Sequence, residues 1–403
     1  MAADPGAAAP SPSLRRTPLH AAAIAAGARM VPFAGWEMAV QFGGLLQEHR
    51  AVRSDCGVFD ISHMGVLSLQ GEGVKDALQQ LVPTDLFRIG PGEACYTVLL
   101  NDNGGIRDDL IVYDRGRGEN AAIQDDAGDE AGGDASAGDD GAGSNGPADN
   151  LLLVINAACA ESDTAWLRQQ LEPAGITIRD RKAGGVLLAL QGPGAAARLE
   201  ALAGVSLEGL PRFGHRDLAL PGLGTAFVGR TGYTGEDGFE ILLEADAGQA
   251  LWEQLLADGV TPCGLGARDS LRLEAAMHLY GNDMDADTTP LEASLGWLVH
   301  LEMPKPFIGR AALEAQSAAG VAKRLVGLEL QGRAIPRHGY PVLRNGEPVG
   351  TVTSGGWSPT LEKGIALASV PADAARLGTE LAVEIRGRAE PALVVKRPFY
   401  RRG

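Results

Sequence analysis

The chain has 403 residues, a net charge of −16, 45% hydrophobic residues and 21% charged residues. An acidic surface repels phosphate backbones, so this balance argues against nucleic-acid binding, and no run approaches the roughly 18 apolar residues needed to cross a bilayer. The length favours two or three domains with sizeable cores. The 55 glycines and the aromatic content of 5% favour many turns and strand ends over a helical bundle.

The first residues and the cysteines indicate a reducing compartment. Met1–Ser13 is rich in Ala and Pro and lacks the basic head and apolar core of a secretory signal. The cysteines are widely spaced and form no CxxC pair, so the spacing of a zinc site is absent. We therefore expect reduced, mostly buried thiols and a cytoplasmic location. The cysteines are Cys56, Cys95, Cys159 and Cys263.

The first predicted elements are a tail, a helix and an insertion. Residues 1–16 are expected to form a disordered tail, and the Ala-rich segment Leu19–Met30 is expected to form a helix. Asn120–Asn150 consists mainly of Ala, Gly, Asp, Ser and Asn, with Ile123 as its one sizeable apolar residue. Such a segment cannot bury enough apolar surface to offset its chain entropy. We therefore predict a disordered acidic insertion over about 117–149, which supplies a good part of the negative charge.

Strands are predicted on both sides of this insertion. Tyr96–Leu100 and Leu110–Tyr113 precede it, and Leu151–Ile155 follows it. The segment Asn101–Gly105 has the sequence Asn-Asp-Asn-Gly-Gly, which is a strong turn signal. The first two strands are therefore expected to form a hairpin.

The rest of the chain alternates between helices and strands. Residues 323–400 contain short β-like runs punctuated by Gly and Pro, which indicates a small all-β domain. Helices are predicted over Glu161–Leu171 and Arg268–His278, and strands over Gly185–Leu190, Thr225–Gly229 and Phe239–Leu243.

The strand that follows the turn carries two adjacent aspartates, Asp108 and Asp109. Side chains alternate between the faces of a strand, so these two point to opposite sides and cannot act as a paired dyad. Asp is depleted in strands. Either both are turn residues or surface charges, or one of them lines a pocket and handles a proton or a developing cation.

A second segment, Arg230–Ile241, carries glycines at 232, 235 and 238. It matches neither a dinucleotide-binding loop nor a Walker loop, but its backbone can approach a flat ligand closely. Glu240 follows within an apolar run, where a carboxylate must find hydrogen-bond donors. A heterocycle edge with an N–H beside an amino group would supply two donors. The alternative is a glutamate at a strand edge that faces water.

A third segment is a turn that leads into the helix with Arg268 and Arg272. Residues four apart share one helix face. Arg268 would then be presented to an anion or a carbonyl oxygen. The alternative is structural ion pairing with Asp269 or Glu274.

Together these segments resemble the aminomethyltransferase family, the T-protein of the glycine cleavage system. The matching stretches run in family order from residue 17 to the end, and the acidic insertion is the one large departure. They are Thr17–Leu19, Phe33–Met38, Gly57–Gly65, Gly105–Tyr113, Gln191–Pro193, Arg230–Glu240, Gly264–Glu274, Leu279–Asp285, Phe307–Arg310 and Thr353–Leu361.

The resemblance implies an α+β fold, with three domains arranged as a cloverleaf around a central folate channel. Residues 17–315 would form the folate-binding region, built of two intertwined α+β domains. Residues 320–403 would form a C-terminal β-barrel-like domain.

The resemblance also implies an enzyme and its reaction. The lipoyl arm of the partner H-protein carries an aminomethyl group, and the T-protein passes its methylene carbon to tetrahydrofolate as co-substrate. The products are 5,10-methylenetetrahydrofolate, ammonia and dihydrolipoyl H-protein. No metal or nicotinamide is implied, and neither an HExxH nor a GxSxG pattern occurs.

Site residues follow from the same resemblance. Asp109 matches the catalytic aspartate, which would accept a proton or stabilise the iminium cation. Glu240 matches the carboxylate that grips the pterin edge, and Arg268 matches a pterin-contacting arginine. The remaining matches are Tyr96, Asn156 and Tyr233 in the folate pocket, with Met64 and Tyr400 as rim candidates.

Two other functions are open to this superfamily. Some members are folate-dependent demethylases, alone or as the C-terminal half of flavin oxidases, and this chain has no flavin-binding half. A non-enzymatic relative is a folate-binding accessory factor for iron–sulfur cluster assembly. That relative carries a diagnostic cysteine motif and lacks the strand aspartate, whereas Asp109 is present here and no such motif is evident.

Overall fold

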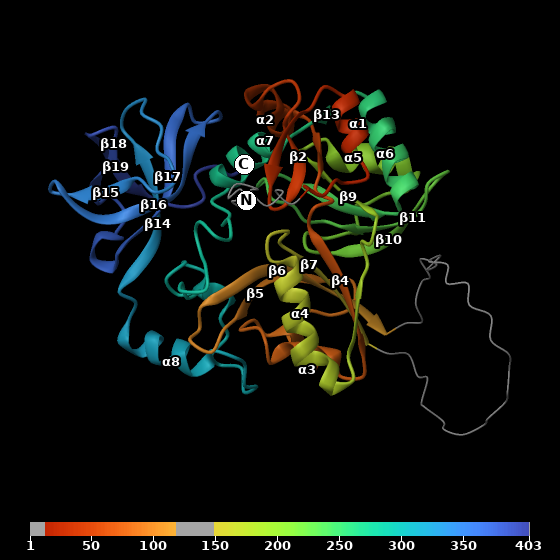
Figure 1. Ribbon diagram of the computed structural model, residues 1–403, viewed down its shortest axis with the longest axis horizontal. Coiled ribbons are helices and arrows are strands. Elements are labelled where there is room, and N and C mark those ends of the chain that lie inside the picture. Colours follow the sequence, from red (N-terminus) through yellow and green to blue (C-terminus); the bar gives the residue numbers. More distant parts are fainter. Residues whose placement is uncertain (1–12, 118–148, 403) are drawn as a thin grey trace, which may run out of the picture.

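The computed structural model describes residues 13–117 and 149–402, which form three lobes (Figure 1). One lobe holds a five-stranded sheet, the second a six-stranded sheet, and the third a closed barrel. Among the described residues, no helix combines the length and apolar character that a membrane crossing requires. The predicted α+β class with a C-terminal barrel is confirmed.

The five-stranded sheet is antiparallel throughout, and a buried apolar cluster joins one of its faces to two helices. The helices are α3 (Val74–Gln79) and α4 (Ala160–Leu171). In spatial order the strands are β5 (Ala94–Leu100), β6 (Ile106–Arg117), β7 (Asp149–Ile155), β4 (Gly65–Gly71) and β8 (Thr177–Asp180).

The six-stranded sheet is antiparallel except at one edge, where β13 runs parallel to β3. Its outer face is covered by α1 (His20–Ala25), α5 (Ala195–Ala203) and α6 (Ala245–Ala257). In spatial order the strands are β10 (His215–Leu220), β11 (Gly224–Gly229), β12 (Gly238–Leu243), β9 (Val186–Gln191), β3 (Gly57–Asp60) and β13 (Thr261–Pro262).

The inner faces of the two sheets share one apolar core. Phe59 and Phe227 from the six-stranded sheet belong to the same buried cluster as Tyr113 and Val154 from the five-stranded sheet. The chain enters the six-stranded sheet at β3, builds the five-stranded sheet with β4 to β8, and returns to the six-stranded sheet at β9. The two sheets are therefore intertwined in sequence.

The third lobe is a barrel closed by the pairing of β14 with β19. Leu273 of α7 packs against barrel residues Leu325, Ile365 and Leu367. The barrel strands, in spatial order, are β14 (Lys323–Leu330), β17 (Lys363–Pro371), β16 (Glu347–Ser358), β15 (Pro341–Arg344), β18 (Glu380–Ile385) and β19 (Arg388–Val395).

Other elements join the lobes. β1 (Arg29–Phe33) and β2 (Trp36–Gln41) form a small hairpin. The remaining helices are α2 (Leu45–Ser54), α7 (Leu265–Glu274) and α8 (Arg310–Ala319). Short 3₁₀ turns cover Leu86–Arg88, Glu172–Ala174, Gly296–Leu298 and Ala372–Ala374.

The predicted hairpin before the insertion is confirmed, since β5 and β6 pair antiparallel. Its turn depends on glycine at two points. Gly104 has a φ of 76°, a left-handed conformation that favours glycine. A Cβ on Gly105 would lie 1.8 Å from the carbonyl oxygen of Ala286. The hairpin therefore packs directly against the segment that follows α7.

Two predicted helices have wrong boundaries. The helix expected over Leu19–Met30 ends at Ala25, because Gly27 turns the chain at a φ of 87° and strand β1 follows. The helix expected over Arg268–His278 instead spans Leu265–Glu274. Ala276 follows it with a φ of 53°, which is incompatible with a continuing helix.

The predicted tail and insertion fall mostly outside the described residues. Of the tail, residues 13–16 are described, and Arg15 pairs with Trp36 in an isolated bridge and forms an ion pair with Glu161. Of the insertion, Arg117 and Asp149 are described, and they pair with each other at the ends of β6 and β7. The rest of both predictions stays untested.

Because Arg117 and Asp149 are paired, a two-residue Asn-Gly turn is long enough to replace residues 118–148. We expect the replacement to change transfer activity by less than about twofold and to leave the melting temperature nearly unchanged, since loop length contributes only weakly to stability. Thermal denaturation and turnover assays of the shortened chain check this. A collapse of either quantity would show that the insertion is structural.

Candidate active site

Asp109 lies near the start of β6, and both of its carboxylate oxygens accept hydrogen bonds. It pairs with Val98 of β5, so its diagonal neighbour on the same face of the sheet is Tyr96. The Tyr96 hydroxyl donates to Oδ2 at 3.0 Å. The Asn156 amide, directly after β7, donates to Oδ1 at 2.8 Å. Three adjacent strands thus bring these three predicted residues together, and each stays partly exposed.

The environment of Asp109 favours a carboxylate that exchanges its proton near neutral pH. Burial raises the pKa of Asp109 to about 7, and the charge of Asp108 adds to the rise. The hydrogen bonds from Tyr96 and Asn156 oppose this rise in pKa, because they stabilise the charged form. Asp109 is therefore suited to accept a proton.

Asp108 faces the other side of β6, as the strand alternation predicts. It is fully buried, whereas Asp109 is partly exposed. Asn156 nevertheless contacts both, because its amide also donates to Asp108 Oδ1 at 2.8 Å. Of the two aspartates, only Asp109 is accessible to a ligand.

Glu240 is 6% exposed in the middle of β12. The Thr231 hydroxyl donates to its Oε2 at 2.8 Å, and the Tyr113 hydroxyl lies 3.4 Å from the same oxygen. Tyr113 belongs to β6, so it connects the two sheets at this point. The prediction that a carboxylate here must find donors is confirmed, and a strand-edge glutamate facing water is excluded.

Arg268 lies on α7 with its guanidinium over the ring of Tyr233, 4.8 Å from the ring centroid. Burial lowers the pKa of Arg268, and the charge of Glu240 opposes this. Within residues 13–117 and 149–402, no acceptor hydrogen-bonds to the guanidinium or forms an ion pair with it. The guanidinium is partly exposed, so its donors are free to bind an acceptor from outside the chain.

Arg272, the other arginine of the predicted pair, has a different role. Its guanidinium forms ion pairs with Asp269 and Asp283, at 2.8 and 2.9 Å, and donates to Ser354 of the barrel at 2.9 Å. The structural alternative is therefore correct for Arg272, while Arg268 has no such partner among the described residues.

Charge effects are felt between these side chains. Burial raises the pKa of Tyr233, and the charge of Asp109 adds to that rise, while Arg268 opposes it. The pKa of Arg268 in turn responds to the charge of Glu240. The direct contact among them is the one between Arg268 and the ring of Tyr233.

The two rim candidates, Met64 and Tyr400, stay predictions, and the structure shows only their contacts within the chain. Met64 packs against the core between the sheets. Tyr400 lies under the Arg53 guanidinium, 4.0 Å from its ring centroid, and its backbone N–H bonds to Glu274. Arg53 also forms ion pairs with Glu236 and Glu274, so Tyr400 belongs to a network that fastens the last residues to α7.

Four further residues around the site escaped the sequence analysis. Tyr113 and Thr231 lie within two quoted motifs, yet only their contact with Glu240 reveals their role. Trp297 is 66% exposed and stacks on Tyr96 with centroids 6.1 Å apart. Asp163 lies behind Asp108, and its position on α4 gave no signal.

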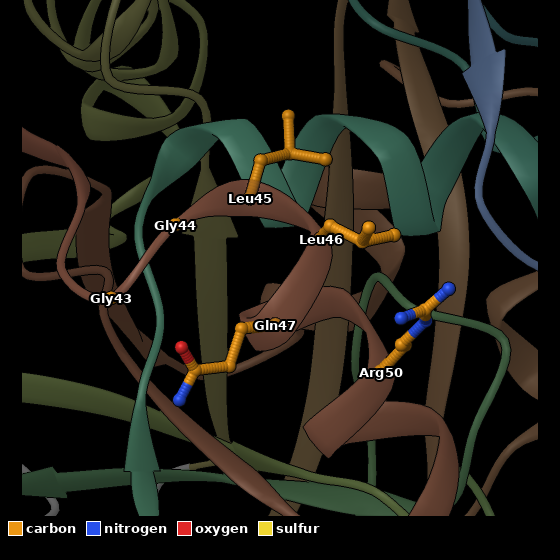
Figure 2. A pocket seen from close by; sticks show the side chains of 6 residues that line it. All are labelled: Gly43, Gly44, Leu45, Leu46, Gln47 and Arg50. Carbon is orange, nitrogen blue, oxygen red and sulfur yellow. The ribbon is translucent and has the colours of Figure 1, made fainter.

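A surface hollow of about 540 Å³ lies at the start of α2 (Figure 2). None of the candidate site residues lines it, and we assign it no role. Its lining residues are Gly43, Gly44, Leu45, Leu46, Gln47 and Arg50.

The cysteines are as predicted. All four are free, and Cys95 alone among them is only partly buried.

Comparisons with known proteins agree with this geometry. Residues 19–131 and 134–303 match the GCVT N-terminal domain family, and residues 323–401 match the glycine cleavage T-protein C-terminal barrel domain. An aminomethyltransferase of Synechococcus sp. (strain RCC307) is 68% identical over 386 residues, which are 96% of this chain and 99% of the relative. One from Parasynechococcus marenigrum (strain WH8102) is 66% identical, with 97% and 100% covered.

A solved structure of an aminomethyltransferase also matches this chain over nearly its whole length. The crystal structure of glycine cleavage system aminomethyltransferase T from Bartonella henselae superposes with a TM-score of 0.83 at 35% identity. The match covers 96% of this chain and 98% of that chain. The chain therefore belongs to the aminomethyltransferase family, the T-proteins of the glycine cleavage system.

Proposed function

We propose that this chain transfers the methylene carbon of the aminomethyl group on lipoyl H-protein to tetrahydrofolate. The products are 5,10-methylenetetrahydrofolate, ammonia and dihydrolipoyl H-protein. The observation that carries the proposal is Asp109, a partly exposed carboxylate whose two oxygens accept hydrogen bonds from Tyr96 and Asn156. We place Glu240 and Arg268 in the same site. The four free thiols suit the reducing cytoplasm, where we place the reaction.

The residues present fit a reduced pterin. Arg268 carries donors without an acceptor among the described residues, and a pterin has a ring carbonyl that accepts hydrogen bonds. Glu240 is an acceptor fixed by Thr231, and a pterin edge offers an N–H beside an amino group. Tyr233 supplies an aromatic face beside them. We propose that these residues hold the ring, with Tyr96 and Asn156 at the end that carries Asp109.

When bound, tetrahydrofolate supplies the amine nitrogen that accepts the one-carbon unit. Asp109 accepts the proton lost from that nitrogen and stabilises the cation that exists once ammonia leaves. Tyr96 and Asn156 fix both oxygens of Asp109, so little reorganisation is needed during the reaction. The substrate carbon is already activated by sulfur and nitrogen, so alignment and exclusion of water are the remaining requirements.

This role predicts a specific pH dependence. Burial raises the pKa of Asp109 to about 7, so the ionised, proton-accepting form predominates above that pH. We expect kcat to rise with pH and to level off above about pH 7, falling about tenfold per unit below it. Single-turnover transfer measured from about pH 5 to pH 8 checks this. A flat profile in that range would contradict proton acceptance by Asp109.

The test of the proposed function is ammonia release from aminomethyl-loaded H-protein, with and without tetrahydrofolate. We expect release to depend on both the chain and tetrahydrofolate, with one methylenetetrahydrofolate formed for each ammonia. Ammonia release at the same rate with and without tetrahydrofolate would overturn the proposal. Folate-dependent demethylation of a small amine without turnover of the loaded H-protein would favour the demethylase alternative.

A further inference from the structure

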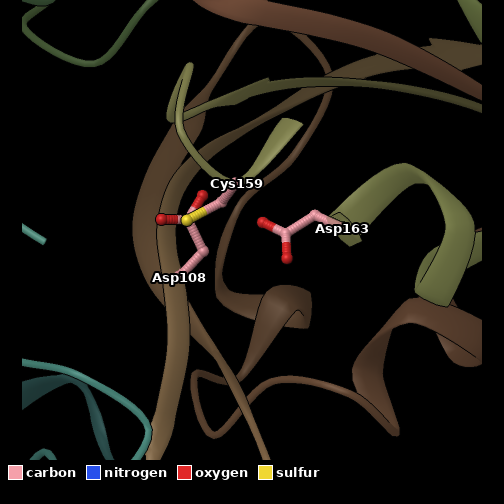
Figure 3. Close-up of side chains that lie close together, drawn as sticks. All are labelled: Asp108, Cys159 and Asp163. Atoms are coloured by element: carbon pink, nitrogen blue, oxygen red, sulfur yellow. The ribbon is translucent and has the colours of Figure 1, made fainter. Parts of the chain in front are cut away.

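Behind Asp109, on the opposite face of β6, lies a closed cluster of Asp108, Cys159 and Asp163 (Figure 3). One ligand atom of each lies within 4.8 Å of the others. Asp108 and Asp163 are 0% and 1% exposed. Figure 3 shows the Asp163 carboxylate, at the start of α4, pointing toward the strand that carries Asp108. The reaction described above does not use this cluster.

The hydrogen bonds of the cluster leave one oxygen unmatched. Asp108 accepts two bonds from Asn156, at 2.8 Å from its amide and at 3.0 Å from its backbone N–H. Asp163 Oδ2 is buried and has no hydrogen-bond partner among the described residues. Two ionised carboxylates facing each other at this depth would repel strongly and leave that oxygen unsatisfied. A proton between them removes both costs.

We propose that Asp108 and Asp163 share one proton, and that this acid pair positions Asn156 and sets the charge felt by Asp109. Asp163 is then a positioning residue that acts through Asp108. This inference rests on the proposed role of Asp109, because only an essential proton acceptor makes that charge matter for the reaction.

Asn156 transmits the effect across the strand. Its single amide nitrogen donates to Asp108 Oδ1 and Asp109 Oδ1, both at 2.8 Å. The position of Asp108 therefore determines where the amide lies, and the amide determines where Asp109 lies. If Asp163 and Asp108 were both ionised, their repulsion would push Asp108 away from Asp163. Asn156, and with it Asp109, would then be displaced.

The groups around the pair agree with a shared proton. Burial raises the pKa of Asp108 and of Asp163, and the charge of Asp163 raises that of Asp108 further. From β6, Arg107 partly offsets the rise in the pKa of Asp163, and Asp109 adds to it. Burial also raises the pKa of Cys159, so its thiol stays neutral.

Two tyrosines from other segments also feel the charge of the pair, although Tyr96 lies on the Asp109 face of the sheet. Tyr96 of β5 and Tyr280, from the segment after α7, both respond to the charge of Asp108. Burial raises the pKa of each tyrosine, so both remain neutral in the range where the carboxylates titrate. The other charged groups whose effect reaches Asp163 are Arg107 and, from the opposite face of β6, Asp109.

Infrared spectroscopy tests the proton directly, independently of any turnover. Spectra are recorded at pH 7 in the Asp109→Asn background, so that Asp109 contributes no acid band. We expect a carboxylic acid carbonyl band that disappears when Asp163→Asn is added, and also when Asp108→Asn is added. Cys159→Ala is the matched control from the same cluster and keeps the band. Persistence of the band in both aspartate variants would overturn the proposal.

Kinetics then test the link to Asp109, using the single variants in otherwise native protein. Asp163→Asn leaves Asp108 fully charged, so the acidic limb of the kcat–pH profile moves up, by as much as about one pH unit. Asp108→Asn removes the nearer charge, so the limb moves down. With Asp163→Asn, KM for tetrahydrofolate stays within about twofold, because Glu240, Arg268 and Tyr233 keep their contacts with the ring.

The two readouts separate the possible failures. The positioning role would be overturned if the aspartate variants lost the infrared band but kept the native kcat–pH profile. A normal rate for Asp109→Asn would instead overturn the proposed function. Stoichiometric divalent metal in the native protein, absent from Asp163→Asn, would identify the cluster as a metal site and contradict the shared proton. If one variant fails to fold, the opposite shift expected of the other still decides the matter.

Discussion

Replacing Asp109 with Asn is expected to lower kcat for methylene transfer by about 10²- to 10⁴-fold, the usual contribution of a positioned general base. Asn keeps the size of the side chain, and its amide oxygen still accepts one of the bonds that Tyr96 and Asn156 donate. The Kd for tetrahydrofolate is expected to stay within about threefold, since Glu240 and Arg268 supply the ring contacts. Stopped-flow transfer and equilibrium titration measure the two quantities.

The control is Asp102→Asn, at the exposed tip of the same β5–β6 hairpin. It changes the net charge equally without altering the site, so both constants should match those of the native chain. The assigned role would be wrong if Asp109→Asn lost tetrahydrofolate binding while the remaining complex turned over normally.

The second large effect is expected at the other end of the site. Glu240→Gln replaces a charged acceptor with an amide, and hydrogen bonds to charged groups contribute about 1.5–3 kcal/mol each. We therefore expect tetrahydrofolate to bind roughly 10- to 100-fold more weakly. At saturating tetrahydrofolate kcat should change little, because Glu240 lies away from the reacting nitrogen. Calorimetric titration and saturation kinetics separate the two.

Glu244→Gln provides a matched control, because Glu244 follows β12 directly and is exposed. Equal affinity of Glu240→Gln and the native chain for tetrahydrofolate would remove Glu240 from the binding site. A fall in kcat with unchanged affinity would instead place Glu240 near the reaction centre.

The sequence predicts strands better than helix ends in this chain. Gly185–Leu190 is a continuous apolar run, Phe239–Leu243 is apolar except for Glu240, and each lies within one residue of its strand, β9 or β12. Helix α1 was predicted too long because alanine content alone hides the left-handed turn at Gly27. The turn is local: Gly27 and Ala28 donate back to Ile24 and Ala23, and a glycine at this position commonly ends a helix.

The candidate site also combines residues that the sequence predicts with contacts that it does not. Strand alternation alone separates Asp108 from Asp109, and the resemblance to the family selects Asp109. No periodicity indicates that Asn156 touches both aspartates, because that contact depends on where β7 ends beside β6. Likewise Tyr113 reaches Glu240 only because two sheets pack face to face. Such contacts across sheets leave no local pattern in the sequence.

A structure of the chain bound to tetrahydrofolate tests the central claim most directly. We predict one pterin spanning the site, with its reactive amine nitrogens facing the Asp109 carboxylate and its amino edge against Glu240. Arg268 should bond to the ring carbonyl beside Tyr233. A pterin bound elsewhere, or one that contacts either acid but not the other, would contradict the account.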